Sequence, residues 1–147
     1  SPKSLLRVEE VHSPLEDFIK GSFQEVLDDT YVDAKKVKKV LLCTGKIAID
    51  LYREQQKQGR KDVAIVRLEQ LYPYPAKQLE KVLKQYKNAK VVWVQEEPKN
   101  MGAYGFMLMY YGAIECISRK ASASPATGYN KIHNKEQEEI IKKAFEL

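Results

Sequence analysis

The sequence predicts one α/β domain in which a mostly parallel sheet is covered by helices on both faces. Three observations point to this class of fold. Short runs rich in β-branched residues, Val37–Thr44, Val63–Leu68 and Lys90–Gln95, have the composition of strands buried on both faces. Segments with apolar residues at helical spacing separate these runs. Glycine or proline punctuates the junctions. Strands that alternate with helices favour a three-layer, Rossmann-like arrangement with right-handed crossovers.

Glycines delimit the first strand and the first helix. Gly45 ends the apolar run that begins at Val37, so we expect a strand over residues 37–44. Apolar residues between Ile47 and Tyr52 then recur at helical spacing, and this helix should end before Gly59. The run 63–68 follows as the second buried strand.

The middle of the chain repeats this alternation. The prolines in Tyr72–Pro75 fix their own backbone and disfavour helix before them, which predicts a rigid connector. Apolar residues from Leu79 to Tyr86 at spacings i, i+3, i+4 and i+7 predict the second helix. The third strand, 90–95, precedes a third helix expected over 102–111.

The last part of the chain predicts one more strand and one more helix. Residues 115–120 alternate enough to form a fourth strand, and the small residues of 121–128 form a loop. We expect the final helix to begin at Asn134, because Gln137 stands three residues later in capping-box position.

Residues 1–36 lack clear periodicity and are interpreted as a connecting segment that docks on a partner domain, which leaves 37–147 as the α/β domain. Within that segment, Phe23, Val26 and Leu27 favour a short edge strand or turn. Cys43 lies inside an apolar run and should be a buried, inert thiol, and the two cysteines show no disulfide or metal spacing.

Composition excludes several classes of protein. The 147 residues are 44% hydrophobic and 31% charged, as in an ordinary globular domain. The net charge of +5 is spread along the chain and interleaved with acidic residues, so no nucleic-acid-binding face is predicted. No apolar run approaches the roughly 20 residues that a membrane span needs, and we expect no membrane partner.

Two consecutive carboxylates, Glu96 and Glu97, follow the third strand and invite two interpretations. They could form a general acid/base pair if burial raised the pKa of one of them. The favoured alternative is that they accept hydrogen bonds from backbone amides at the next helix start, or pair with arginines across an interface.

Other candidates for chemistry carry weaker signals. The Gly102–Gly105 turn could hold a phosphate at a helix N-terminus, but it lacks the nucleotide-binding fingerprints, and the adjacent carboxylates would repel an anion. His12 and His133 belong to no metal-binding or triad motif, so we predict no metal, cofactor or catalytic residue in this chain. Arg119, Lys120 and Lys131 flank the 121–128 loop, which leaves an anion contact open.

Three blocks of sequence, Val63–Pro75, Trp93–Ala103 and Ser122–Gly128 with His133 following, resemble the C-terminal domain of the E1 component of 2-oxoglutarate dehydrogenases. The resemblance covers nearly the whole chain in order. It implies a fold like that of the third domain of transketolases. Residues 1–36 would then be the link from the preceding pyrimidine-binding domain.

The resemblance also implies a function for the parent enzyme. That enzyme would decarboxylate 2-oxoglutarate on thiamine diphosphate with Mg²⁺ and pass the succinyl group to the lipoyl arm of the E2 succinyltransferase, with E3 completing the complex. The family's cofactor motifs and catalytic histidines lie upstream, so this chain by itself should be an assembly and regulatory domain without turnover. The parent would be a homodimer, in the bacterial cytoplasm or, in a eukaryote, the mitochondrial matrix.

Some members of the family bind acetyl-CoA or AMP, so a stand-alone module that binds these effectors is the alternative function. The resemblance assigns candidate anion contacts to Lys3, Arg7, Lys77 and Lys81, although Ala76–Gln78 lacks the arginines expected there. Candidate interface and loop residues are Glu96, Glu97, Asn100, Tyr104 and Arg119, and contacts between subunits are expected at Tyr104, Met107, Met109 and Tyr110. Tyr104 replaces a tryptophan common in the family and should still pack as an aromatic residue.

Overall fold

A five-stranded sheet forms the centre of the fold in the computed structural model, which describes residues 23–123 and 129–147. The strands stand in the order β1-β3-β2-β4-β5, and β1 alone runs antiparallel to its neighbour. Their bounds are β1 Val26–Leu27, β2 Lys39–Cys43, β3 Val63–Leu68, β4 Lys90–Pro98 and β5 Glu115–Arg119. The predicted mostly parallel sheet is therefore confirmed.

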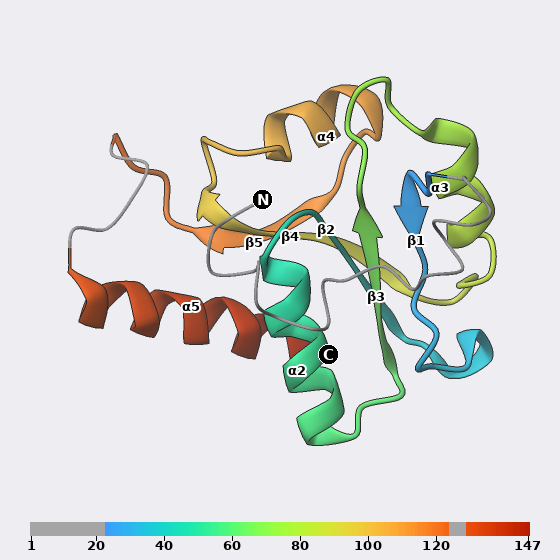
Figure 1. Cartoon of the computed structure of the whole chain (residues 1–147), viewed down its shortest axis with the longest axis horizontal. Helices are drawn as coiled ribbons and strands as arrows, with labels where there is room; N and C mark the ends of the chain where they lie inside the picture. Colours follow the sequence, from blue (N-terminus) through green and yellow to red (C-terminus); the bar gives the residue numbers. More distant parts are fainter. Residues whose placement is uncertain (1–22, 124–128) are drawn as a thin grey trace.

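Helices cover both faces of this sheet (Figure 1). One layer holds α2 (Ile47–Gln58) and α5 (Asn130–Phe145), and the other holds α3 (Ala76–Leu83) and α4 (Tyr104–Tyr110). A 3-10 turn, η3 (Ala34–Lys36), precedes β2. The three-layer, Rossmann-like arrangement agrees with the sequence prediction.

Alternate residues of the central strands supply two separate cores. Leu41 and Val94 face α2 and α5, whereas Leu42 and Trp93 face α3 and α4, and all four side chains are fully buried. Strands buried on both faces need no polar alternation, which explains their uninterrupted apolar runs. Cys43 is also fully buried, and burial raises the pKa of its thiol to about 12, as expected for an inert cysteine.

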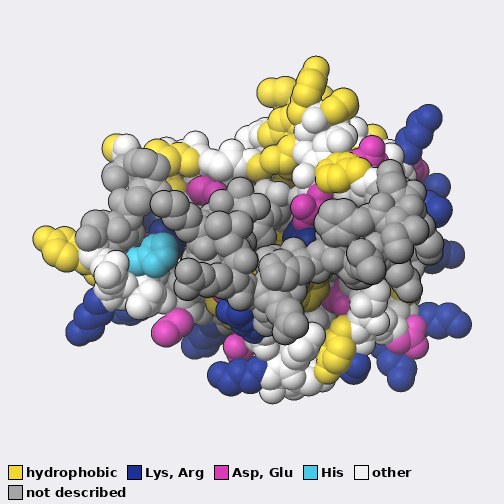
Figure 2. All heavy atoms as spheres, viewed as in Figure 1, with side chains coloured by type: hydrophobic (Ala, Val, Ile, Leu, Met, Phe, Trp, Pro, Cys, Tyr) yellow, Lys and Arg dark blue, Asp and Glu magenta, His cyan; other side chains and the backbone are white. Residues whose placement is uncertain are grey.

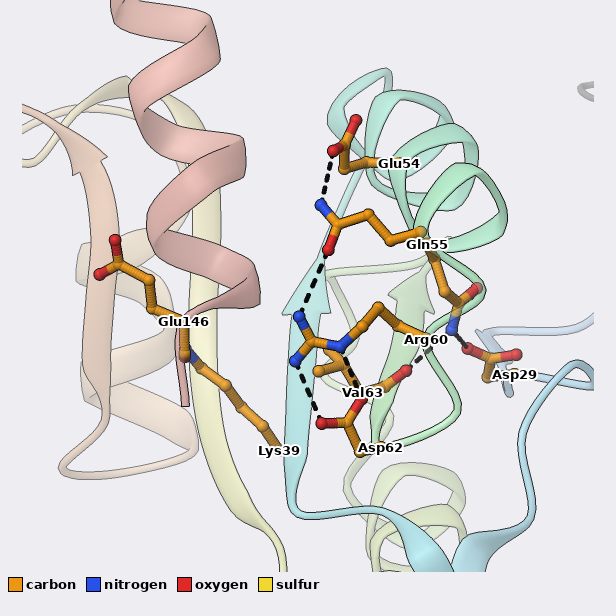
Figure 3. Close-up of polar contacts among 9 residues, drawn as sticks. Asp29, Lys39, Glu54, Gln55, Arg60, Asp62, Val63 and Glu146 are labelled. Atoms are coloured by element: carbon orange, nitrogen blue, oxygen red, sulfur yellow. Dashed lines mark hydrogen bonds and ion pairs between the residues drawn. The ribbon is translucent and has the colours of Figure 1, made fainter.

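The first described residues belong to the sheet. Val26 and Leu27 form the expected edge strand on β3. The buried Asp29 Oδ2 accepts a hydrogen bond from Gln55 Nε2 at 2.7 Å (Figure 3). It also accepts one from Ile65 N at 2.9 Å. Residues 26–29 thus contribute a strand and a buried carboxylate to the α/β domain.

A buried lysine fastens the end of α5 to the sheet. Lys39, the first residue of β2, donates from Nζ to the carbonyl oxygen of Glu146 at 2.7 Å (Figure 3). The same Nζ donates to the carbonyl oxygen of Lys143 at 3.2 Å. These carbonyls lie at the negative pole of the helix dipole, where a cation is stabilising. Burial is the main cause that lowers the pKa of Lys39.

Several boundaries differ from the prediction, and contacts distant in sequence explain two of them. The last helix begins at Asn130, and the expected capping box at Asn134 is wrong, because the Gln137 side chain bonds Asp50 and Glu96 instead. Strand β4 continues past Gln95 to Pro98, because β5 pairs with it as far as Pro98 and Arg119 after a register shift. Among the described residues, no helix has both the length and the apolar character that a bilayer crossing requires.

Candidate functional site

The parallel strands end together at one edge of the sheet, the place where α/β folds usually bind their ligands. Most of the sequence-predicted loop residues lie near this edge, at the ends of β4 and β5. Glu96 and Glu97 lie in the last part of β4, and Arg119 is the last residue of β5. Lys99 N donates to the carbonyl oxygen of Arg119 at 3.0 Å, so backbone bonding extends beyond both strands.

Gln95 organises the loop between β4 and α4. Its Oε1 accepts from Trp93 Nε1 at 2.9 Å and from Tyr104 N at 3.1 Å. Its Nε2 donates to the carbonyl oxygens of Pro98 at 3.0 Å and Met101 at 2.8 Å. The side chain is buried and uses both its donor and acceptor groups. Sequence reasoning missed Gln95, although an amide at the end of a fully apolar run was the available signal.

Only glycine fits at position 102. Gly102 has a φ of +66°, and a Cβ there would lie 3.0 Å from Glu97 Oε2 and 3.1 Å from Gln95 Oε1. The Glu97 carboxylate therefore lies directly beside the turn that was considered for phosphate. A phosphate there would meet a negative charge, so the geometry does not favour that interpretation.

The two glutamates point to opposite faces of β4, as consecutive strand residues do. Glu96 faces α5, where its Oε1 accepts from Gln137 Nε2 at 3.0 Å, while Glu97 faces Gly102 on the other side. They cannot act together on one substrate as an acid/base pair. At the start of α4, Tyr104 N donates to Gln95 Oε1 rather than to either carboxylate.

Gln137 connects three elements at this edge. Its amide nitrogen also donates to Asp50 Oδ2 on α2 at 3.2 Å, and its Oε1 accepts from Arg119 Nη2 at 3.3 Å. Burial is the first cause that raises the pKa of Glu96; Lys46 opposes the rise, while Asp50 and Glu97 add to it. A half-buried carboxylate is thus held by a neutral amide rather than by a direct cation.

Arg119 is the cation at the centre of this polar cluster, with a side chain only 8% exposed. Its Nη2 lies 2.9 Å from His133 Nδ1, and its Nε lies 3.3 Å from Glu136 Oε2. Because the guanidinium carries only donors, His133 Nδ1 must be the acceptor. The sequence-predicted Glu96 and Arg119 are therefore brought together, through Gln137.

Asn100 joins the loop after β4 to the loop after β5. Its Nδ2 donates to Ser122 O at 2.8 Å, and its Oδ1 accepts from Ser122 N at 3.0 Å. Tyr104 is tied inside the domain, since its hydroxyl donates to Ile114 O at 3.0 Å. Both candidate loop residues therefore make contacts within this chain.

The candidate cations and subunit contacts are distributed differently. Lys77 and Lys81 are exposed on α3, in the layer opposite α5. Lys3 and Arg7 lie outside the described residues. Among the expected subunit contacts, Met107 is wrong, because its side chain is fully buried in the core between the sheet and α4.

No group of three metal-ligating side chains occurs in the described parts of the chain. The described side chains at the edge mainly contact one another and neighbouring backbone. The candidate site of this α/β domain is therefore chiefly a set of contacts that hold the loops and α5 in place.

Comparison with known proteins places this domain in a family. The model of the 2-oxoglutarate dehydrogenase C-terminal family matches residues 12–145, and the chain belongs to that family. It is 42% identical to the 2-oxoglutarate dehydrogenase E1 component of Cupriavidus necator over 99% of the chain and 16% of that protein. The E1 component of Azotobacter vinelandii is also 42% identical, over 99% of the chain and 17% of that protein.

The Buchnera aphidicola protein named oxoglutarate dehydrogenase is 40% identical over 100% of the chain and 17% of its own length. The chain thus spans about one sixth of the length of these curated relatives.

Proposed function

We propose that this chain is the C-terminal assembly and regulatory domain of a 2-oxoglutarate dehydrogenase E1 enzyme. The observation that carries the proposal is identity of 42% to E1 components across 99% of the chain. The structure supports a non-catalytic role, because Gln95 and Arg119 at the polar edge form hydrogen bonds with other groups of the same domain. The domain would pack against other parts of the parent enzyme and respond to effectors, while the reaction takes place elsewhere in the parent.

The proposed parent reaction is the decarboxylation of 2-oxoglutarate, with transfer of the succinyl group to a lipoyl arm. Thiamine diphosphate and Mg²⁺ would supply the carbanion chemistry of this reaction. The polar edge described above does not suit them, because Glu96 and Glu97 would oppose a diphosphate and no metal-ligand cluster occurs in the described residues. We therefore assign cofactor binding to parts of the parent outside this chain.

The proposed partners follow from the same assignment. They are a second E1 chain, the E2 succinyltransferase with its lipoyl domain, and E3. The relatives compared above come from bacteria, which supports the bacterial cytoplasm as the location.

A regulatory role would use the exposed cations of α3. Lys77 and Lys81 lie one helical turn apart on the surface, a spacing that places both ammonium groups on one face. We propose them as contacts for the phosphates of acetyl-CoA or AMP. Calorimetric titration of the full-length protein, beside a variant with both lysines changed to alanine, tests this. Equal heats from the two proteins would exclude these lysines as the contacts.

The main experiment uses the full-length gene product, supplied with thiamine diphosphate and Mg²⁺. Reduction of an electron acceptor is followed with 2-oxoglutarate and, in parallel, with pyruvate. Strong preference for 2-oxoglutarate supports the proposed parent reaction. Activity with neither acid would contradict it and would favour the effector-binding alternative.

A further inference from the structure

A cavity of about 650 Å³ lies at the edge of the sheet where the parallel strands begin. It is lined by the first residues of β2, β4 and β5 and by the last turn of α5. Small-molecule sites in proteins typically have volumes of about 300–1,000 Å³, so this cavity is large enough for a ligand. It is at the opposite edge from Gln95 and Arg119, whose side chains are occupied by contacts within the domain.

Positively charged side chains predominate around the cavity. The described residues that line it include four lysines and two glutamates, which are Lys38, Lys39, Lys90, Lys143, Glu115 and Glu146. On the face of the molecule drawn in Figure 2, lysine and arginine side chains stand at separate places with acidic side chains between them. An excess of positive charge in a concave site raises the local concentration of anions.

One of the two glutamates is already paired within the cavity. Glu115 Oε2 accepts a hydrogen bond from Lys90 Nζ, and this bond is the first cause that lowers the pKa of Glu115. The pair therefore stays ionised at neutral pH and its charges balance. This leaves one described glutamate against the three remaining lysines of the cavity, an excess that suits a ligand with two negative charges.

Lys39 offers a hydrogen-bond donor to such a ligand. It is only 7% exposed, and its Nζ bonds the two carbonyl oxygens at the end of α5. An ammonium carries three N–H donors, so one remains beyond these two described bonds. Burial is the largest cause that lowers the pKa of Lys39, and the attraction of Glu115 and Glu146 offsets only part of this effect. Carbonyl groups are neutral, whereas an anion in the cavity would balance the buried charge.

The wall formed by β5 is less polar than the rest of the cavity. Cys116 and the buried Ile117 line it, so the site suits a molecule with a short carbon skeleton better than an inorganic ion. We propose that the cavity binds a small organic dianion, a dicarboxylate or a phosphate monoester, with Lys39 as its buried contact. Lys90 and Lys143 would surround the ligand.

Acetylation of lysines by an N-hydroxysuccinimide ester tests the site in the native full-length protein. The rate at each lysine is measured by mass spectrometry with succinate, with glycerol 3-phosphate or with neither, at an ionic strength held constant with sodium chloride. Ligand at about 10 mM and a dissociation constant of about 1 mM predict roughly tenfold slower acetylation of Lys90 and Lys143. Lys84 at the end of α3 and Lys135 on α5 are exposed controls and should react unchanged.

Each result of this footprint has a definite meaning. Slower acetylation of Lys90 and Lys143 with one compound or both supports the site and tells whether it takes the carboxylate or the phosphate group. Equal slowing at Lys84 and Lys135 would show a general effect of salt and would overturn the proposal. Unchanged rates at Lys90 and Lys143 would overturn it as well.

The variant Lys39→Met tests the buried contact. Methionine keeps an apolar stem and removes the ammonium, and buried charges can often be replaced by apolar residues of similar volume without loss of stability. We expect this variant to lose the protection of Lys90 and Lys143. Lys36→Met, which changes an exposed lysine of η3, should retain it. Full protection in a folded Lys39→Met protein would overturn the assignment of Lys39, and the wild-type footprint decides the site even if this variant does not fold.

The cavity is separate from the α3 lysines proposed for acetyl-CoA or AMP, and its footprint needs no turnover. A parent that acts on another 2-oxo acid would contradict the proposed function and leave the footprint unaffected. A 2-oxoglutarate dehydrogenase without the footprint would overturn only the dianion site.

Discussion

Gln137 on α5 donates a hydrogen bond of 3.0 Å to Glu96 near the end of β4. The same amide nitrogen donates to Asp50, so one neutral group serves two carboxylates. A neutral amide does not cancel the charge of Glu96, and the pKa of this half-buried carboxylate stays raised. The end of β4 is therefore a place where protonation and folding are linked.

The first prediction concerns this linkage. The folded pKa of Glu96 lies above its unfolded value, so the folded state binds more protons. The free energy of unfolding therefore falls as pH rises from about 4.5, the ordinary pKa of a glutamate, through the folded pKa. Glu96→Gln keeps an oxygen for Gln137 and removes the titration. We expect this variant to lose that decrease and to be more stable than the wild type at neutral pH.

Chemical denaturation of the full-length protein between pH 4 and 8 measures the effect. Glu139→Gln is the matched control, because Glu139 is exposed on α5 and is not one of the charges that shift the pKa of Glu96. An unchanged pH profile for Glu96→Gln would show that Glu96 carries no such linkage.

The second prediction compares Gly102, in the loop before α4, with Gly105, inside α4. Gly102→Ala would force a positive φ on alanine and place its Cβ 3.0 Å from Glu97 Oε2, so we expect a loss of about 1–3 kcal/mol in stability. Gly105→Ala lies inside α4 with nothing within 4 Å of the new Cβ, and should be neutral or stabilising by up to about 1 kcal/mol. Thermal unfolding measures both, and equal effects would contradict the tight approach at Gly102.

The third prediction tests the cation at the centre of the polar cluster. Arg119→Ala removes the partner of His133, Gln137 and Glu136, and should cost about 1–3 kcal/mol. Lys120→Ala next to it is exposed and should change stability by less than about 0.5 kcal/mol. Hydrogen exchange adds a local readout, because loss of Arg119 should increase exchange at the start of α5. Unaltered exchange there would mean that Arg119 does not hold this helix.

The fourth prediction concerns the first described segment. Asp29→Ala leaves the buried Ile65 amide without its side-chain acceptor and removes one partner of Gln55, so we expect a loss of about 2–3 kcal/mol. Asp33→Ala, which removes only the exposed cap of η3, should cost about 0.5–1 kcal/mol. Denaturant unfolding compares them. If the Asp29 variant were no less stable than the Asp33 variant, residues 26–29 would not be an integral part of the sheet.

The elements that sequence predicted well are those with uninterrupted apolar runs. Leu41, Leu42 and Trp93 are buried because their strands lie between two helical layers. Strands buried on both faces consist of nearly uninterrupted apolar residues, which can be recognised in the sequence. The start of α5 was mispredicted because the local capping signal of Gln137 competes with tertiary partners that no local pattern contains. Glu96 and Arg119 could be picked out as polar strand ends, but their connection depends on Gln137, a helical residue eighteen positions beyond Arg119.

Met107 and Met109 show the same limit within one helix. Both are methionine in an uncharged stretch, and only the packed structure shows that the first lies in the core and the second on the surface. Sequence spacing predicted the helix but could not orient it, because apolar residues occupy every side of it.

The attachment of Lys39 to the last turn of α5 affects how this domain should be excised for study. A fragment shortened before Glu146 would lose the carbonyl oxygen that lies 2.7 Å from the Lys39 ammonium. The buried cation would then keep the Lys143 carbonyl oxygen but lose its shorter hydrogen bond. An affinity tag placed directly after Phe145 would alter the same contact. Expression vectors that retain Glu146 and add any extension beyond Leu147 preserve it, so the choice of terminus is itself a determinant of whether the separated domain remains intact.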